Sequence, residues 1–200
     1  MAFTKRMAAR CGVLLGTLIA SHAQAQQSAP ATVAALSTSA CYAIASGAFV
    51  MPSGPNVADQ LIKAVESLGL DFGVSNEAMS QGPAVTTLIS RATLGSKTLA
   101  DGQILFADGG PAGCRIVLLA DPKPGLTDSV ASGLVTGEWR AIPEMTATRG
   151  AIERRAFIRR DKAGAPYLLN LMTVLDQPGK LRLFTTVAKI LPNVTIPAGY

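Results

Sequence analysis

Five runs of strand-like residues, separated by short turns, dominate the second half of this 200-residue sequence. The runs cover residues 103–107, 114–120, 151–160, 166–175 and 181–190. Residues 108–113, 161–164 and 177–180 connect neighbouring runs and contain the Gly, Pro and Asp residues that favour tight turns. Because connections this short join antiparallel strands, the pattern predicts an antiparallel sheet of roughly five strands.

Helical patterns lie before this sheet and within it. Apolar residues recur at three- and four-residue spacing over residues 31–46 and 57–68. We expect a further helix over residues 127–137 with Thr127 as its cap, and a short one over residues 84–94. The elements together predict an α+β fold, in which N-terminal helices precede strands in ββ-α-βββ order.

This order of elements, over about residues 100–190, resembles that of profilin- and PAS-like domains. The resemblance implies a five-stranded antiparallel sheet with helices on one side, and a sensor or scaffold domain. It concerns the order of elements alone, and such an order does not fix function. We expect one α+β domain over residues 26–200, with residues 26–31 as a mobile, polar start.

The first 25 residues have the three parts of a secretory signal peptide. An apolar segment over residues 11–20 is about half as long as a membrane-spanning helix. Its flanks carry the cations and the small residues that export and cleavage require: Lys5, Arg6, Arg10, Ala23 and Ala25. The sequence therefore predicts a bacterial protein that is periplasmic or secreted, without a transmembrane segment in its mature form.

Cleavage after Ala25 should leave Gln26 as the first residue of the mature protein, because Ala23 and Ala25 satisfy the small-residue requirement of signal peptidase. The intact mass of protein recovered from the periplasmic fraction measures this directly. Retention of residues 1–25 would contradict the prediction.

Loss of the leader changes what the composition implies. Three of the 18 cations leave with it, so that 15 remain against 13 carboxylates, and a nucleic-acid partner is no longer indicated. The single histidine, His22, leaves as well. A mature chain without histidine has no His-based nucleophile activation and no His metal ligand, and we expect no metal and no cofactor.

Cys41 and Cys114 are the two cysteines of the mature chain. In an oxidising compartment an even pair predicts one disulfide, here between the first helix and the second strand. The alternative is a reactive thiol, which oxidation of the pair would remove.

A cluster of cations is the strongest charge feature: Arg149, Arg154, Arg155, Arg159, Arg160 and Lys162. Such a cluster is able to contact an anionic lipid, a polysaccharide or an acidic protein surface. Alternation along a strand places Arg155 and Arg159 on one side, and Arg154 and Arg160 on the other. The competing interpretation is a solvated edge strand, whose charges prevent edge-to-edge association.

Two further features have alternative interpretations. Trp139 is either a core residue or a platform for a ligand. Asn170 lies in an apolar run, and the sequence does not decide whether it faces the core or solvent.

These observations favour a non-enzymatic binding or accessory protein of the cell envelope, whose partner is an envelope protein or a polyanion. The alternatives are a histidine-free hydrolase of envelope polymer and a purely structural envelope component. The hydrolase would use paired carboxylates, for which Glu138, Glu144 and Glu153 are the candidates. The mature chain lacks the Gly-x-Ser-x-Gly and Ser-x-x-Lys nucleophile motifs, so we predict no catalytic residues.

Overall fold

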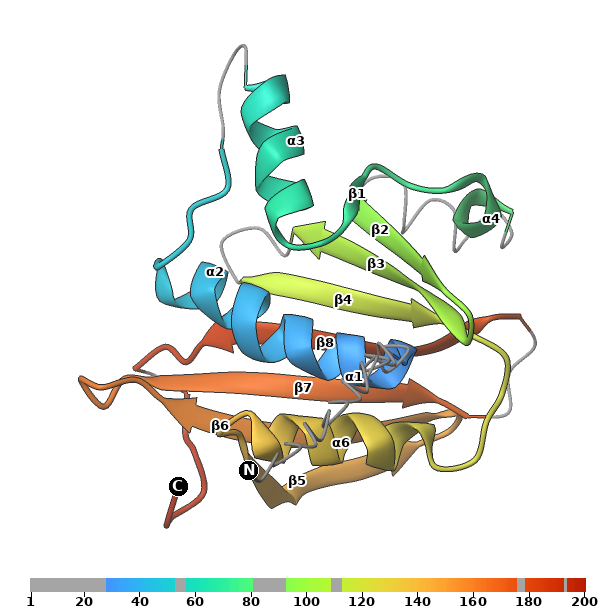
Figure 1. Ribbon diagram of the computed structural model, residues 1–200. Coiled ribbons are helices and arrows are strands. Elements are labelled where there is room, and N and C mark those ends of the chain that lie inside the picture. The colour runs from blue at the N-terminus through green and yellow to red at the C-terminus, as the bar shows by residue number, and fades with distance from the viewer. Residues whose placement is uncertain (1–27, 53–56, 81–92, 109–112, 176–178, 193) are drawn as a thin grey trace, which may run out of the picture.

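The computed structural model describes residues 28–52, 57–80, 93–108, 113–175, 179–192 and 194–200 (Figure 1). Its helical elements are α1 (Ala29–Leu36), the π-helical turn η1 (Ser37–Cys41), α2 (Tyr42–Ser46), α3 (Ala58–Ser67), α4 (Asn76–Met79) and α6 (Leu126–Thr136). Its strands are β1 (Asp71–Phe72), β2 (Thr93–Leu99), β3 (Gly102–Asp108), β4 (Cys114–Leu119), β5 (Arg140–Arg149), β6 (Ile152–Arg160), β7 (Pro166–Val174) and β8 (Leu181–Lys189).

All the strands belong to one eight-stranded antiparallel sheet in the order β1-β2-β3-β4-β8-β7-β6-β5. The two halves of the sheet, β1 to β4 and β5 to β8, are each built from consecutive neighbours. The last strand, β8, pairs with β4 and joins the halves. Helix α6 connects β4 to β5 and thereby carries the chain from the middle of the sheet to its outer edge.

The predicted fold class was wrong. The five predicted strands correspond to β3, β4, β6, β7 and β8, but the sheet also contains β1, β2 and β5. The resemblance to profilin- and PAS-like domains depended on a five-stranded order. It was therefore wrong, because the sheet has eight strands. Residues 84–92 of the helix expected over 84–94 lie outside the described residues, and Leu94 belongs to β2.

Two local expectations also need correction. Residues 29–31, expected in a mobile start, belong to α1, which Ser28 caps and whose Ala29 amide donates to Asp101 Oδ1 at 2.9 Å. Thr127 does not cap α6: the cap is Gly125, at a left-handed φ of 73°, and Thr127 is the second helical residue. The predicted signal peptide lies outside the described residues.

The main core lies between one face of the sheet and three helical elements, α1, α2 and α6 (Figure 1). Val33, Leu36 and Ala40 are buried against the sheet, which agrees with the helical spacing of the sequence. Gly133 of α6 lets α1 approach closely, because a Cβ atom there would lie 2.7 Å from the Cβ of Ala34. No helix in the described part of the chain is long and apolar enough to span a membrane.

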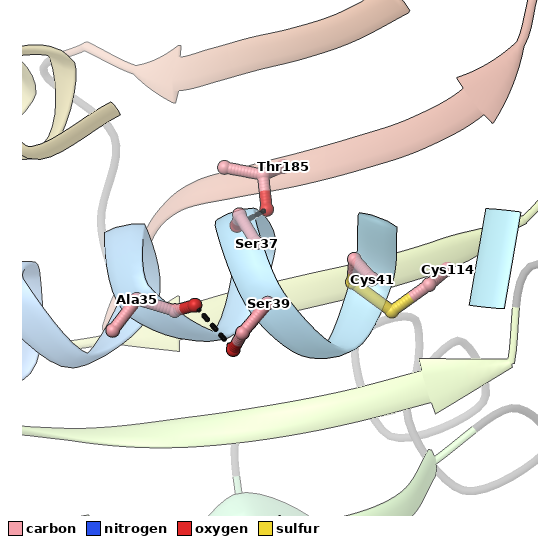
Figure 2. The surroundings of a disulfide bond; sticks show 6 residues. All are labelled: Ala35, Ser37, Ser39, Cys41, Cys114 and Thr185. Atoms are coloured by element: carbon pink, nitrogen blue, oxygen red, sulfur yellow. Dashed lines mark hydrogen bonds between the residues drawn. A yellow bond between two sulfur atoms is a disulfide. The ribbon is translucent and has the colours of Figure 1, made fainter. Parts of the chain in front are cut away.

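The disulfide anchors this helical layer to the sheet (Figure 2). Cys41 of η1 and Cys114 of β4 are bonded, with Cα atoms 5.0 Å apart and a sequence separation of 73 positions. Both side chains are buried, so the pair does not offer an accessible thiol. One turn earlier, the buried hydroxyls of Ser37 and Thr185 lie 2.7 Å apart and fix η1 over β8.

Strand β5, and not the cation-rich strand, forms an edge of the sheet. The cation-rich strand is β6, which pairs with β5 on one side and β7 on the other. The expectation that its charges protect an edge was therefore wrong. Between the pairs Ile142–Ala156 and Ala147–Arg154, the four residues 143–146 of β5 lie opposite Arg155 alone. This bulge interrupts the outer strand, as is common at sheet edges.

Candidate anion-binding face

Strand alternation and pairing distribute the predicted cation cluster over both faces of the sheet. Arg155 and Arg159 lie on the helix side, because Phe157 between them belongs to the core under the helices. Arg154 and Arg160 lie on the other side, with Ala156. The remaining two residues do not lie on β6: Arg149 ends β5, and Lys162 is exposed in the turn between β6 and β7.

Arg155 is neutralised by two carboxylates. Its Nη1 lies 2.7 Å from Asp128 Oδ1 in the first turn of α6, and its Nε lies 2.6 Å from Glu153 Oε1 on the same strand. Partial burial alone would lower the pKa of Arg155, but the hydrogen bonds to Glu153 and Asp128 outweigh that effect and raise the pKa. This guanidinium therefore joins α6 to the sheet, and its positive charge is compensated by the two carboxylates.

Arg159 is held in a similar way. Its Nη2 lies 2.6 Å from Glu138 Oε2, and its Cζ lies 3.9 Å from the centre of the Tyr42 ring. Glu138 reaches this position from a left-handed backbone conformation, at a φ of 71°, directly after α6. The arginine thus bridges α2 and the α6–β5 junction, which is a structural role.

The opposite face of the sheet collects arginines from three strands. We call this surface the arginine face, and its members are Arg115 of β4, Arg140 and Arg149 of β5, and Arg154 and Arg160 of β6. Arg140 pairs with Ile158 and Arg149 with Ile152, which places both on the side of Arg154. Arg115 lies between Cys114 and Ile116, whose side chains enter the helix-side core, so it points the other way.

Carboxylates are scarce around these arginines. Glu153 is the only acidic residue of β4, β6, β7 and β8, and it faces the helices. Strand β5 contributes only Glu144, whose carboxylate accepts a hydrogen bond from the Tyr200 hydroxyl at 3.1 Å. Within the described residues, the ion pairs involve Arg155 and Arg159 and none of the arginines on the arginine face.

The centre of the arginine face combines polar and apolar groups. Arg154 Nε donates to Asn170 Oδ1 at 2.9 Å, which settles the position of Asn170 on this face. The Arg115 Cζ atom lies 6.0 Å from the centre of the Phe184 ring, and its buried Nε has no hydrogen-bond partner among the described residues. Cross-strand pairing places Thr186 beside both Arg115 and Asn170, so hydroxyl, amide and guanidinium groups form a continuous row.

At one end of the face, two arginines bind the last described residues, which we call the closing segment (residues 194–200). Arg140 Nη2 donates to Gly199 O at 2.8 Å, and Arg160 Nη2 donates to Tyr200 O at 2.7 Å. Loss of solvation, followed by the hydrogen bond that the Tyr200 hydroxyl donates to Glu144, raises the pKa of this hydroxyl.

The other sequence candidates are not arranged for binding or catalysis. Trp139 is 1% exposed, and its ring meets Tyr42 edge-on at 6.1 Å, so its faces are not open to a ligand. Glu138 and Glu153 are engaged by arginines on the helix side, whereas Glu144 binds Tyr200 on the opposite side. They do not form a pair about a common space, and no cluster of metal-ligating side chains occurs within the described ranges.

A concave region lies on the helix side, where α6 passes over β5 and β6. A cavity of about 640 Å³ lies between Val135 of α6 and Pro143 of the β5 bulge, and a second of about 470 Å³ lies at the start of α6. The Arg155–Asp128–Glu153 cluster lines both cavities, and its cation is paired with the two carboxylates; Lys123 and Arg182 also line the second cavity. This region therefore offers fewer cations than the arginine face.

Sequence reasoning missed Arg115 and Arg140. A lone cation within the apolar run of β4 marks Arg115 as pointing away from the core, but only the β4-β8-β7-β6 order places it on the face of Arg154. Arg140 was missed because β5 was not predicted. No protein-family model, curated protein or solved structure matches this chain.

Proposed function

We propose that this is an extracytoplasmic binding protein that holds a polyanionic partner on the arginine face. The observation that carries the proposal is the separation of charge between the two sides of the sheet. Arg155 and Arg159 on the helix side have carboxylate partners, whereas the five arginines of the arginine face have none among the described residues. Uncompensated guanidiniums on one surface raise the local concentration of anions and bind their oxygens with charge-assisted hydrogen bonds.

The spacing of these arginines favours an extended partner over a compact anion. Arg149 and Arg154 are diagonal neighbours on paired strands, at about 7–8 Å. Arg115 is separated from Arg154 by β8 and β7, so their backbones are about 14 Å apart at about 4.8 Å per strand. Guanidiniums at such distances do not converge on one phosphate or carboxylate, but they match a chain that carries repeated anionic groups.

The predicted signal peptide and the disulfide are compatible with an extracytoplasmic location, where acidic polysaccharides and acidic protein surfaces are accessible. Arginine stays charged over the whole physiological pH range, so binding through this face needs no titrating group. A chain without mature histidine is consistent with such a role.

Replacing Arg115 and Arg154 by Gln should weaken binding to a heparin matrix. Two lost charge contacts of about 0.2–1 kcal/mol each lower the affinity by roughly 2- to 30-fold, and the double variant should elute at lower salt. The protein is produced with its leader, purified from the periplasm and compared by its salt elution position.

Arg155→Gln together with Arg159→Gln is the matched control, because it removes the same charge from the helix side. We expect this control to elute near the wild type, since its guanidiniums are already paired with carboxylates. Equal shifts for the two double variants would show that net charge alone determines retention. An unchanged salt elution position for the Arg115→Gln, Arg154→Gln double variant would also contradict the proposal.

A further inference from the structure

The closing segment lies on the arginine face and already occupies part of it. Ile196 and Tyr200 pack against the small core formed by Ile142, Ala156 and Ile158. The same segment takes hydrogen bonds from Arg140 and Arg160. It therefore covers the end of the face where two of its five arginines lie.

Each contact of this segment resembles a contact that an external ligand would make. Arg140 donates to the carbonyl oxygen of Gly199 while its Cζ lies 4.6 Å from the centre of the Tyr200 ring. Arg160 donates to an oxygen of Tyr200, and a second donor of Arg160, Nη1, binds Gly164 O at 2.9 Å. The Nη2 donors of Arg140 and Arg160 that bind the closing segment cannot bind a polyanion at the same time, so each guanidinium offers a polyanion fewer of its five N–H groups.

We propose that the closing segment is an internal competitor of the polyanionic partner, and that full binding along the arginine face displaces Tyr200. This inference rests on the proposed function. In the closed state the partner meets Arg115, Arg149 and Arg154. After displacement, it also gains Arg140 and Arg160, so one polyanion extends over both ends of the face.

The closing segment is held by few contacts, so a polyanion is able to replace it on Arg140 and Arg160. Residues 194–200 form no helix and pair with no strand, and Thr195, Ala198 and Gly199 are exposed. Segments of this kind open locally at a small fraction of the global unfolding free energy. An anionic oxygen also forms a stronger hydrogen bond to guanidinium than the Gly199 carbonyl does, by about a factor of two.

Displacement has an opposing electrostatic effect. It breaks the hydrogen bond between the Tyr200 hydroxyl and Glu144, which leaves this exposed carboxylate without its hydroxyl donor near the same face. Opening therefore makes two guanidiniums available to the polyanion, which attract it, and frees one carboxylate, which repels it. Partner chains that reach Arg140 and Arg160 are favoured, whereas short anions that reach only Arg149 and Arg154 gain nothing from opening.

Tyr200→Ala should bind heparin roughly 2- to 30-fold more tightly than the wild type, because two more guanidiniums become fully available. Val194→Ala is the matched control, since Val194 is 48% exposed in the same segment, whose hydrogen bonds to Arg140 and Arg160 come from Gly199 and Tyr200. Adding Arg140→Gln and Arg160→Gln to Tyr200→Ala should abolish the gain. The same two substitutions in the wild type should change the affinity less.

The ring NMR signals of Tyr200 in the wild-type protein give a readout that needs no variant. Saturating heparin should shift these signals, because the ring leaves the Arg140 guanidinium at 4.6 Å, whereas a short sulfated disaccharide should not. Unchanged Tyr200 ring signals with heparin, or unchanged heparin affinity in a folded Tyr200→Ala variant, overturns the competition. If Arg115→Gln with Arg154→Gln leaves heparin binding unchanged, the proposed function itself fails, and the two failures are thus distinguishable.

Discussion

Replacing both Cys41 and Cys114 by Ala should lower the free energy of unfolding by about 4 kcal/mol, as expected for a crosslink that closes a long loop in the unfolded chain. The two residues are 73 positions apart in sequence, so the bond strongly restricts the unfolded ensemble. Urea unfolding of the purified protein measures the change. Against a typical total of about 5–15 kcal/mol, this is a large share of the stability.

The wild-type protein, unfolded in the presence of a reductant, is the control for this variant. It should unfold at nearly the same urea concentration as the alanine variant, because both lack the bond. A variant that is much less stable than the reduced wild type would assign the loss to repacking around η1 and not to the crosslink. Two free thiols in the denatured, unreduced protein would contradict the bond and restore the interpretation as a reactive cysteine.

The strands that sequence analysis located are those with regular apolar alternation between clear turns. In β7, burial alternates at every residue from Pro166 to Val174, and the turn before it, around Gly164, has the expected hairpin composition. Local pattern is sufficient for such strands, because both the pleat and the turn are encoded within about ten residues.

The missed strands depend on contacts from elsewhere in the chain. Gly95 breaks the pattern of β2, yet a Cβ atom there would lie 2.4 Å from Val65 Cγ1, so α3 packs over β2 only because position 95 lacks a side chain. Pro143 and Glu144 break the pattern of β5, and the structure accommodates both residues in its bulge. These features normally indicate loops, which is why the sheet was underestimated.

The candidate site, like the sheet, was predictable only in the features that depend on local sequence. Alternation correctly separated Arg155 and Arg159 from Arg154 and Arg160. It could not show which arginines are paired with carboxylates, because Asp128 comes from α6 and Glu138 from the turn after it. The partners of a charge are tertiary information, and they decide whether an arginine has a structural role or is available to a ligand.

Trp139→Ala should lower the free energy of unfolding by about 3–5 kcal/mol, the usual cost of removing a large buried aromatic side chain. Trp139 is 1% exposed and meets Tyr42, whose ring lies 5.1 Å from that of Tyr167 and beneath the Arg159 guanidinium. Its removal leaves a cavity where α2, the α6–β5 junction and the sheet meet. Heparin binding should not change while the variant is folded, since Trp139 lies on the helix side.

Trp139→Phe is the matched control for this position. The indole Nε1 is buried without a hydrogen-bond partner among the described residues, so phenylalanine forfeits no hydrogen bond and retains most of the packing. We therefore expect a loss of stability well below that of alanine, measured by the same urea titration. Weaker heparin binding by Trp139→Phe at unchanged stability would instead assign the indole to the ligand platform, and would move the binding site from the arginine face to the helix side of the sheet.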